Sequence, residues 1–436
     1  MVSLIGLGVS IDYSLFITSR FREELQGGQG AEEALATALG GAGRAVAFSG
    51  ITVAVGLCSL LFFPGTYATS IGLCGALTVL AAVVFALTFL PALLAILGPR
   101  IGRVQVRRGK RRGRGGGFWR GLAIRVMRRP IVFLVPTMVL LVLAGMPFLH
   151  LRMAAADFHQ LPPDDPARLS YNTLSEEFPN QAFTLVSVVV DYPSGNPLSA
   201  QRVGDLYDLS RRAATIHGVD RVTGPLESEP GMTRVGYQQL LSKPRDQLPP
   251  SVRDTLTGSV GRHIVVMSVI SQSDINSTTA QHIAQMLREE HVRGGRVMVT
   301  GQTALNMDAV AYILQRAPYA VAFVAGLSLI LLFLLTGSVV LPIKAILSNL
   351  VSICASFGAL VWIFQQGHLQ HLLNFTPQPI DPSILVLLFA AVFGLSMDYE
   401  VLLVSRIQEK YRETGNNAYA GVTGLQHSGG LITGAA

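Results

Sequence analysis

The chain has 436 residues, of which half are hydrophobic and only 14% are charged. This composition excludes an ordinary soluble enzyme and predicts a membrane protein. The formal net charge of +7 is misleading, because it comes from one basic run near residue 110.

Segments long enough to cross a bilayer, which takes about 20 residues, recur along the chain. The first, Met1–Ser19, contains Asp12 and lacks the basic start and the cleavage site of a signal peptide. The others carry little or no charge: Ala45–Phe63, Tyr67–Leu97, Ile131–Leu149, Ala317–Thr336, Ala345–Phe364 and roughly Ser383–Val404. We therefore predict a membrane α-helical bundle of about seven spans plus the start of another.

The basic run lies between the third and fourth of these segments. Twelve arginines and lysines and no acid stand between Arg100 and Arg129. The positive-inside rule predicts that this run is cytoplasmic, where it can also contact anionic membrane lipids. No aromatic platform accompanies it, so nucleic-acid binding is not predicted. Counting spans outward from it places residues 151–315 outside the cytoplasm in a multi-pass plasma-membrane protein.

Residues 151–315 have the mixed polar composition of a folded domain. Segments rich in β-branched residues predict strands at Thr184–Asp191, Val219–Thr223, His263–Ser271 and Arg296–Thr300. Helical patterns lie between them at 196–216, with Asn196 as the expected N-cap, and at 277–292. Two strand–helix–strand units in succession predict an external α+β domain of ferredoxin type. The stretch Pro225–Ser259 yields no prediction.

An internal repeat links the first and last spans. Residues 8–24 read GVSIDYSLFITSRFREE, and residues 394–410 read GLSMDYEVLLVSRIQEK. Glycine, serine, aspartate, tyrosine, serine, arginine and glutamate recur at identical spacing. Two similar membrane halves are a known plan of transporters. Because the second copy stops early and Met1 begins inside a span, we expect the chain to be truncated at both ends.

The repeat places an Asp-Tyr pair inside the membrane in each half: Asp12 with Tyr13, and Asp398 with Tyr399. Each aspartate lies eight residues, or about 12 Å, from an arginine expected at the interface, which puts both near mid-membrane. An aspartate there costs roughly 2.5–3.5 kcal/mol, so two at matching places indicate a function. A carboxyl group deprived of water favours its protonated form, and a neighbouring tyrosine can pass a proton on. We predict a proton relay of these four residues.

Small and hydroxylated neighbours are expected to support the relay. Gly8 and Gly394 predict close helix approach, and Ser10, Ser49 and Ser396 are the expected polar support. The alternative is a purely structural role, in which the aspartates form hydrogen bonds between helices. The Ser-Arg-x-x-Glu ends of the two repeats are interpreted as helix anchors at the membrane surface.

Other chemistries find no support in the sequence. The three cysteines lie inside apolar spans and predict neither a disulfide framework nor a metal site. No G-x-x-x-x-G-K-S/T segment occurs, so drive by ATP is not expected. We predict no catalytic residues, no cofactor and no metal.

The two repeat segments resemble the MMPL family (mycobacterial membrane protein, large) of the resistance-nodulation-division superfamily. The resemblance implies lipid export driven by the proton gradient for envelope assembly, with protons and a lipid or hydrophobic small molecule as partners. It implies five regions: spans of the first half (1–99), a basic cytoplasmic linker (100–129), the span that opens the second half (130–150), an external porter domain (151–315) and further spans (316–436). Substrate identity and oligomeric state stay open.

Three alternatives remain. The same relay could export drugs or siderophores, and a relative within the superfamily could sense lipid without pumping. An intramembrane aspartyl protease also uses two membrane aspartates, but neither aspartate here follows a glycine directly, and the duplicated surroundings favour a transporter.

Overall fold

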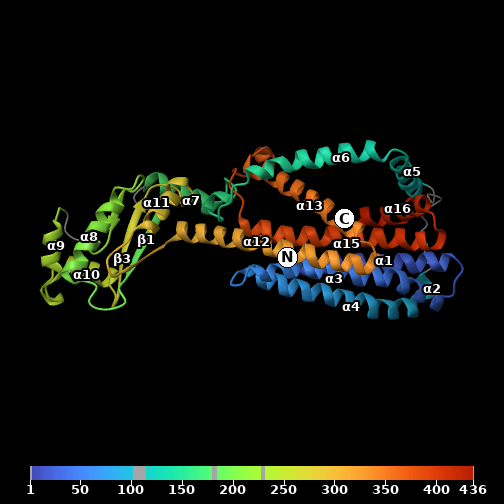
Figure 1. Cartoon of the computed structure of the whole chain (residues 1–436), viewed down its shortest axis with the longest axis horizontal. Coiled ribbons are helices and arrows are strands. Elements are labelled where there is room, and N and C mark those ends of the chain that lie inside the picture. The colour runs from blue at the N-terminus through green and yellow to red at the C-terminus, as the bar shows by residue number, and fades with distance from the viewer. Residues whose placement is uncertain (1, 102–113, 179–183, 227–230, 436) are drawn as a thin grey trace. The chain divides into compact units, whose positions relative to one another are not determined.

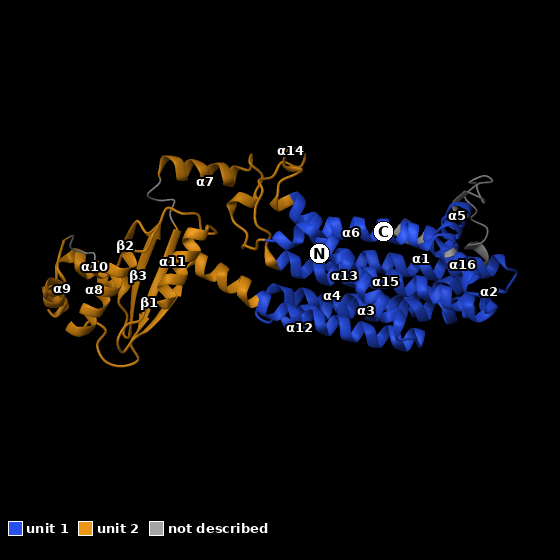
Figure 2. Cartoon of the chain, turned by 45° about the horizontal axis from the view of Figure 1, so that its top comes forward, with its two compact units in different colours: residues 1–151, 313–363, 383–436 blue, residues 152–312, 364–382 orange. Residues whose placement is uncertain are grey.

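The computed structural model describes residues 2–101, 114–178, 184–226 and 231–435. It divides into two compact units, shown in different colours in Figure 2. Unit 1 comprises residues 1–151, 313–363 and 383–436, and unit 2 comprises residues 152–312 and 364–382. The basic run predicted as a linker lies partly outside the described residues, since nothing is described between 101 and 114.

Unit 1 is a bundle of long apolar helices (Figure 1). Its helices are α1 (Val2–Gln26), α2 (Ala31–Ala38), α3 (Arg44–Cys58), α4 (Tyr67–Ile101), α5 (Arg114–Arg128), α6 (Pro130–Gly145), α13 (Val340–Leu360) and α16 (Asn417–Ala435), together with most of α12 (Gln302–Thr336) and α15 (Pro382–Thr414). A π-helical turn joins α2 to α3, and a 3₁₀ turn extends α3 to Phe62. Helices suit a bilayer because they satisfy their backbone hydrogen bonds internally.

Among the described residues, seven helical segments are long and apolar enough to cross a membrane. They are Val2–Gln26, Ala31–Phe62, Tyr67–Gly98, Pro130–His150, Gln302–Thr336, Val340–Gln365 and Pro382–Thr414. Each covers one of the seven predicted segments to within one residue at the ends of that segment, so the predicted membrane bundle is confirmed. The helices extend further than the apolar stretches, however. The first continues to Gln26, and helix resumes at Ala31.

The first helix shows how the bundle sorts its side chains. Its exposed large residues, Leu4, Leu7, Ile11 and Leu15, recur at intervals of three to four and form one stripe. The opposite stripe is buried and consists of Val9, Tyr13, Phe16, Ile17, Arg20 and Phe21. This periodicity places Tyr13 inside the bundle, as expected for a helix with one lipid-facing side.

Unit 2 contains an antiparallel sheet. Its described strands are β1 (Thr184–Asp191), β2 (Arg221–Thr223), β3 (Ile264–Ser271) and β4 (Arg296–Thr300), in the order β2-β3-β1-β4. The helices α8 (Ala200–Ala214) and α11 (Thr278–Glu289) connect β1 to β2 and β3 to β4. This order and these connections are those of a ferredoxin-type fold, which confirms the predicted α+β domain. Valines 186, 188 and 190 of β1 are buried against both helices.

Two details of unit 2 differ from the sequence prediction. Helix α8 begins at Ala200 after Ser199, so Asn196 is not its N-cap. The Asn196 side chain instead accepts a hydrogen bond from the Leu198 amide, because asparagine readily closes a local turn. The stretch without a prediction forms α9 (Arg234–Leu241) and α10 (Pro250–Ser259). Unit 2 also contains α7 (Pro166–Glu177) and α14 (Gln370–Leu373).

Residues 364–382 join unit 2 although they lie between two spans in the sequence. The Ile380 amide donates to the Arg152 carbonyl at 3.0 Å, and the Ala154 amide donates to the Ile380 carbonyl at 3.3 Å. The Asn374 side chain donates to Asp164 at 2.9 Å. These backbone and side-chain bonds attach the segment to the start of unit 2, a pairing that hydropathy does not reveal.

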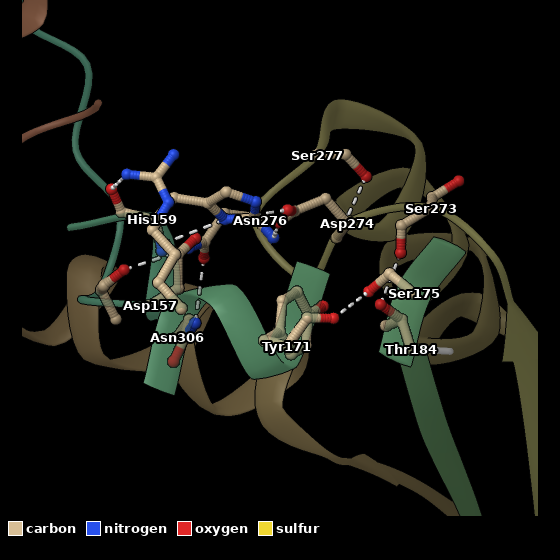
Figure 3. Close-up of polar contacts among 12 residues, drawn as sticks. Asp157, His159, Tyr171, Ser175, Thr184, Ser273, Asp274, Asn276, Ser277 and Asn306 are labelled. Carbon is tan, nitrogen blue, oxygen red and sulfur yellow. Dashed lines mark hydrogen bonds and ion pairs between the residues drawn. The ribbon is translucent and has the colours of Figure 1, made fainter. Parts of the chain in front are cut away.

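A polar cluster ties the beginning of unit 2 to its end (Figure 3). The Asn276 amide donates to Asp157 and to the Ala155 carbonyl, both at 3.0 Å. Asn306, on α12, donates in turn to the Asn276 side-chain oxygen at 3.0 Å. The loop that follows β3 therefore fastens the chain where it enters unit 2 to the helix by which it leaves.

Candidate proton-relay site

The two predicted Asp-Tyr pairs lie on α1 and α15, the duplicated helices of unit 1. Tyr13 is fully buried and Asp398 is 1% exposed, whereas Asp12 and Tyr399 are half-buried. All four side chains are close enough to interact electrostatically. The structure therefore brings together the residues that the repeat singles out.

The first contact between the pairs is direct. The Tyr399 hydroxyl donates a hydrogen bond to an Asp12 carboxylate oxygen at 3.1 Å. The two residues are 387 positions apart and belong to different copies of the repeat. A tyrosine of one half thus binds the aspartate of the other half.

The second contact runs through a serine of α3. The Ser49 hydroxyl donates to Asp398, and it lies 3.3 Å from the Tyr13 hydroxyl. All three side chains are at most 1% exposed. Tyr13, Ser49 and Asp398 therefore form a short hydrogen-bonded chain that is closed to water. The two halves of the relay differ, because only one contains an intervening serine.

Glycines bring α3 against α15 one to two helical turns beyond this serine. A Cβ atom on Gly56 would lie 3.1 Å from the Ala390 carbonyl oxygen and 3.3 Å from the Gly394 Cα. A Cβ atom on Gly394 would lie 3.4 Å from the Val53 Cα. The two backbones approach this closely only because both positions lack side chains. This approach sets Ser49 within reach of Asp398.

The other predicted supports lie elsewhere. Gly8 is exposed and a Cβ atom there would meet nothing within 4 Å, so it makes no close helix contact. The Ser10 hydroxyl donates to the Gly6 carbonyl of its own helix at 2.6 Å, a common use of serine within apolar helices. Ser396 makes no hydrogen bond to a relay residue within the described part of the chain. Gly394 is the small residue of the repeat that contacts a neighbouring helix.

Two polar residues near the relay escaped the sequence analysis. Asn349 of α13 is 2% exposed and donates to the Phe393 carbonyl at 3.5 Å. Glu400 follows Tyr399 directly and lies within electrostatic range of Lys344. A lone amide in an uncharged span, and an acid where the first repeat has Ser14, are the signals that point to them.

A group that could hold a metal ion lies in unit 2, away from the predicted relay residues. The ligand atoms of Asp157, His159 and Asp274 are all within 4.8 Å of one another. The His159 Nδ1 atom lies 3.4 Å from Asp157 and 3.5 Å from Asp274, distances that an ion pair with a protonated histidine also explains. Asp157 is already engaged by Asn276, so we interpret the group as part of the polar cluster of Figure 3.

Comparison with known proteins identifies the family. The sequence profile of the MMPL family matches residues 1–133 and 160–436, which is most of the chain. The chain belongs to the MMPL family. The matched residues include both Asp-Tyr pairs and Ser49.

Sequence relatives agree with this assignment. The MMPL chain is 31% identical over 463 residues to the trehalose monomycolate exporter MmpL3 of Mycolicibacterium smegmatis, covering all of this chain and 43% of that protein. It is 29% identical to the mycolic acid-containing lipids exporter MmpL11 of the same organism, again covering all of this chain and 43% of the relative. The chain thus spans less than half the length of these relatives.

The fold has a counterpart among solved structures. The hedgehog release protein Disp from the water bear Hypsibius dujardini aligns with all of this chain and 59% of its own, with a TM-score of 0.63 and 14% identity. At that identity the likeness concerns the fold alone. Together with the apolar helices, membership of the MMPL family makes this a multi-pass membrane protein.

Proposed function

We propose that the protein exports lipids or lipid-like molecules across the plasma membrane and uses the proton gradient to drive them. The observation that carries the proposal is the contact between the halves: Tyr399 binds Asp12, while Ser49 joins Tyr13 to Asp398. The exporters MmpL3 and MmpL11, to which the chain is similar, support the transport of lipid. No step of this proposal needs a cofactor or a catalytic residue.

The buried hydrogen bonds suit a proton carrier. Ser49 lies within hydrogen-bond distance of both Asp398 and the Tyr13 hydroxyl. A serine hydroxyl has one proton, so while Ser49 donates to an ionised Asp398, its bond with Tyr13 requires Tyr13 as the donor. When Asp398 is protonated the same three groups can reverse every bond without moving apart. Ser49 therefore keeps a hydrogen bond to Asp398 whether or not the carboxyl group carries the proton, and Tyr13 completes the bonding of Ser49.

Protonation also changes how the halves are held together. An ionised Asp12 accepts a charge-assisted bond from Tyr399, and this bond weakens once the carboxyl group is neutral. Helices α1 and α15 are then less tightly joined. One proton crossing the membrane releases about 2.3 kcal/mol per 100 mV, which is available to shift such a contact. We propose that this shift drives rearrangement of the bundle.

The proposal extends to orientation. We place unit 2 outside the cytoplasm and residues 100–129 inside it, because the basic run obeys the positive-inside rule. The ferredoxin-type sheet of unit 2 would then meet the cargo after it leaves the membrane. Regions 1–99, 130–150 and 316–436 supply the spans, and 151–315 supply most of the external domain.

Reconstitution into liposomes tests the proposal. A pH-sensitive dye inside the vesicles reports proton uptake, and a fluorescent trehalose ester of a long-chain fatty acid reports lipid movement. Asp12→Asn and Asp398→Asn each remove one carboxylate at nearly constant volume, and both should abolish uptake and lipid movement. Glu33→Gln, an exposed acid on α2, is the matched control and should leave both signals unchanged.

The outcomes separate the alternatives. Full uptake by both aspartate variants would refute the relay. Proton uptake that accompanies a cationic dye, but never the lipid, would replace lipid with small drugs as the cargo. Lipid binding that is indifferent to the gradient, with no transport, would identify a lipid sensor.

A further inference from the structure

The repeat continues past the Asp-Tyr pairs into a Ser-Arg-x-x-Glu segment that the relay does not use. Its arginines, Arg20 on α1 and Arg406 on α15, are 9% and 6% exposed. An arginine this deeply buried is uncommon unless acidic groups surround it. Both lie on the end of the bundle that the topology predicts to be cytoplasmic.

The acids around them come from both copies of the repeat. Arg20 lies 2.5 Å from Glu409, 2.9 Å from Glu24 and 3.4 Å from Glu23. Arg406 lies 3.5 Å from Glu409 and 3.8 Å from Glu23. Each arginine thus pairs with the glutamate of its own copy and with that of the other copy. We call these five residues the arginine clasp.

The clasp and the relay share the same helix faces. Asp12, Phe16 and Arg20 follow one another at intervals of four on α1, as Asp398, Leu402 and Arg406 do on α15. Phe16 and Leu402 are each 5% exposed and belong to one apolar cluster, and the Arg406 guanidinium lies 5.2 Å from the centre of the Phe16 ring. One apolar layer therefore separates the relay from the clasp.

Two cavities reach the clasp. One, of about 350 Å³, is lined by Phe16, Ala45, Ser405, Arg406 and Glu409, with other residues of α2, α15 and the turn before α3. The other, of about 400 Å³, is lined by Arg20, Glu23, Glu24, Arg406 and Lys410, with residues of α16. Both have room for many water molecules. Water at this end can therefore reach the clasp, and Phe16 at the edge of the apolar layer, while Leu402 stays buried.

We propose that the arginine clasp is the gate at the cytoplasmic end of the relay, with Arg20 and Arg406 as positioning residues that keep α1 and α15 together over the Phe16–Leu402 layer. This inference rests on the proposed function for the relay that it guards. The clasp holds two positive and three negative groups in a small space, and it closes through the ion pairs that cross between the two halves. A loosening of α1 from α15 at Asp12 and Tyr399 would draw the cross-pairs apart and let water reach Leu402.

The contacts of Arg406 are longer than the shortest contact of Arg20. Its two ion pairs measure 3.5 and 3.8 Å, whereas the pair between Arg20 and Glu409 measures 2.5 Å. Loss of Glu409 removes a partner from both arginines at once and leaves Glu23 as the acid that pairs with both. Glu409→Gln should therefore open the gate more than Glu24→Gln, which removes a pair within α1 alone.

Thiol labelling at Leu402 tests the gate without requiring transport. The three native cysteines are replaced by alanine, Leu402→Cys is introduced, and a membrane-impermeant maleimide is applied from the arginine end. Slow labelling is expected in the parent. Glu409→Gln and Arg20→Gln should each raise the rate about tenfold, which corresponds to ~1.4 kcal/mol. Arg22→Gln, at an exposed arginine of the same helix, should not.

Thermal unfolding of the same variants distinguishes a gate from a cluster that only stabilises the fold. A lower unfolding temperature with Leu402→Cys still protected would mean that the clasp only stabilises the fold, and it would overturn the proposal. Arg20→Lys keeps the positive charge and replaces Arg20→Gln in the experiment if that variant does not fold. Unchanged labelling of Leu402→Cys in both Arg20→Lys and Glu409→Gln would also overturn the gate proposal. Faster labelling in vesicles that show no proton uptake even in the parent would support the gate and refute the relay.

Discussion

The Tyr399 hydroxyl lies 3.1 Å from the Asp12 carboxylate, whereas Tyr13 reaches Asp398 only through Ser49. The two copies of the repeat have the same residues at these positions, yet their contacts differ. The reason is α3, which presents Ser49 to one aspartate. The other aspartate is half-buried and relies on the tyrosine alone. The proposed relay is therefore asymmetric in its contacts although its sequence is duplicated.

This asymmetry predicts unequal effects of removing the two tyrosine hydroxyls. Tyr399→Phe takes the one side-chain donor described for Asp12 and should lower the rate of proton uptake about tenfold, as expected for loss of a bond to a charged group worth ~1.5 kcal/mol. Tyr13→Phe leaves the bond between Ser49 and Asp398 and should cost about threefold or less by the same reasoning. Dye-loaded vesicles measure both rates. Equal losses would contradict the asymmetric relay.

Ser49→Ala should destabilise the membrane unit. Asp398 is 1% exposed, and removal of its donor leaves a buried carboxyl group without that hydrogen bond. A cost of roughly 1–3 kcal/mol is expected for such a group. Ser10→Ala and Ser14→Ala are matched controls, because these hydroxyls bond only to backbone carbonyls of α1. Thermal unfolding in detergent measures the effect, and a loss as large in the controls would show that serine removal in general is responsible.

Gly56→Leu should separate α3 from α15 and disable the relay without removing any polar group. A Cβ atom added at this position would lie 3.1 Å from the Ala390 carbonyl oxygen, so the larger leucine side chain would clash with α15. Gly8→Leu is the control, since that position faces open space. Proton uptake should fall at least about tenfold in the first variant, since a small displacement of a reacting group is costly. Normal uptake by Gly56→Leu would show that the helix contact does not position Ser49.

The sequence was sufficient for the architecture because the membrane imposes it. Apolar stretches of about 20 residues have few alternatives to a spanning helix, and β-branched runs between helical patterns predicted β1 and β4 at their observed bounds. The repeat predicts Asp12, Tyr13, Asp398 and Tyr399 as functional residues, because an aspartate in a membrane segment costs free energy and is found twice at matching positions. Hydropathy and internal repeats can both be read directly from a single sequence.

Contacts between helices were harder to predict. The sequence suggested that Gly8 and Gly394 bring α1 and α15 together, but Gly394 contacts Val53 of α3. Which face of a helix meets which neighbour depends on the rotation of both, and periodicity fixes only the buried side. Segment 364–382 joins unit 2 through backbone hydrogen bonds, which leave no mark on side-chain pattern. The sequence pattern predicts Arg20 and Arg406 as helix anchors at the membrane surface, whereas the structure buries both, because the burial of a charged side chain depends on its partners.

Unit 2 should lose stability in alkaline solution through Tyr192. Burial raises the pKa of Tyr192 from its ordinary value of 10.0 to about 12; nearby Asp205 adds to the rise, and the Arg202 guanidinium opposes it. The unfolded chain therefore releases this proton at lower pH than the folded chain does. The stability that the neutral hydroxyl confers is complete below pH 10 and is lost between about pH 10 and pH 12.

Tyr192→Phe isolates this contribution. The Tyr192 hydroxyl has no hydrogen-bond partner among the described residues, and its ring stacks under Arg202 at 4.4 Å, so phenylalanine should fold equally well near neutral pH. Above pH 10 the variant should unfold at a higher temperature than the parent, because it has no proton to lose. Thermal unfolding at several pH values between about 8 and 12 measures the difference. Tyr207→Phe, at a half-buried tyrosine of α8, is the control, and equal alkaline protection by both variants would mean that Tyr192 is not the group responsible.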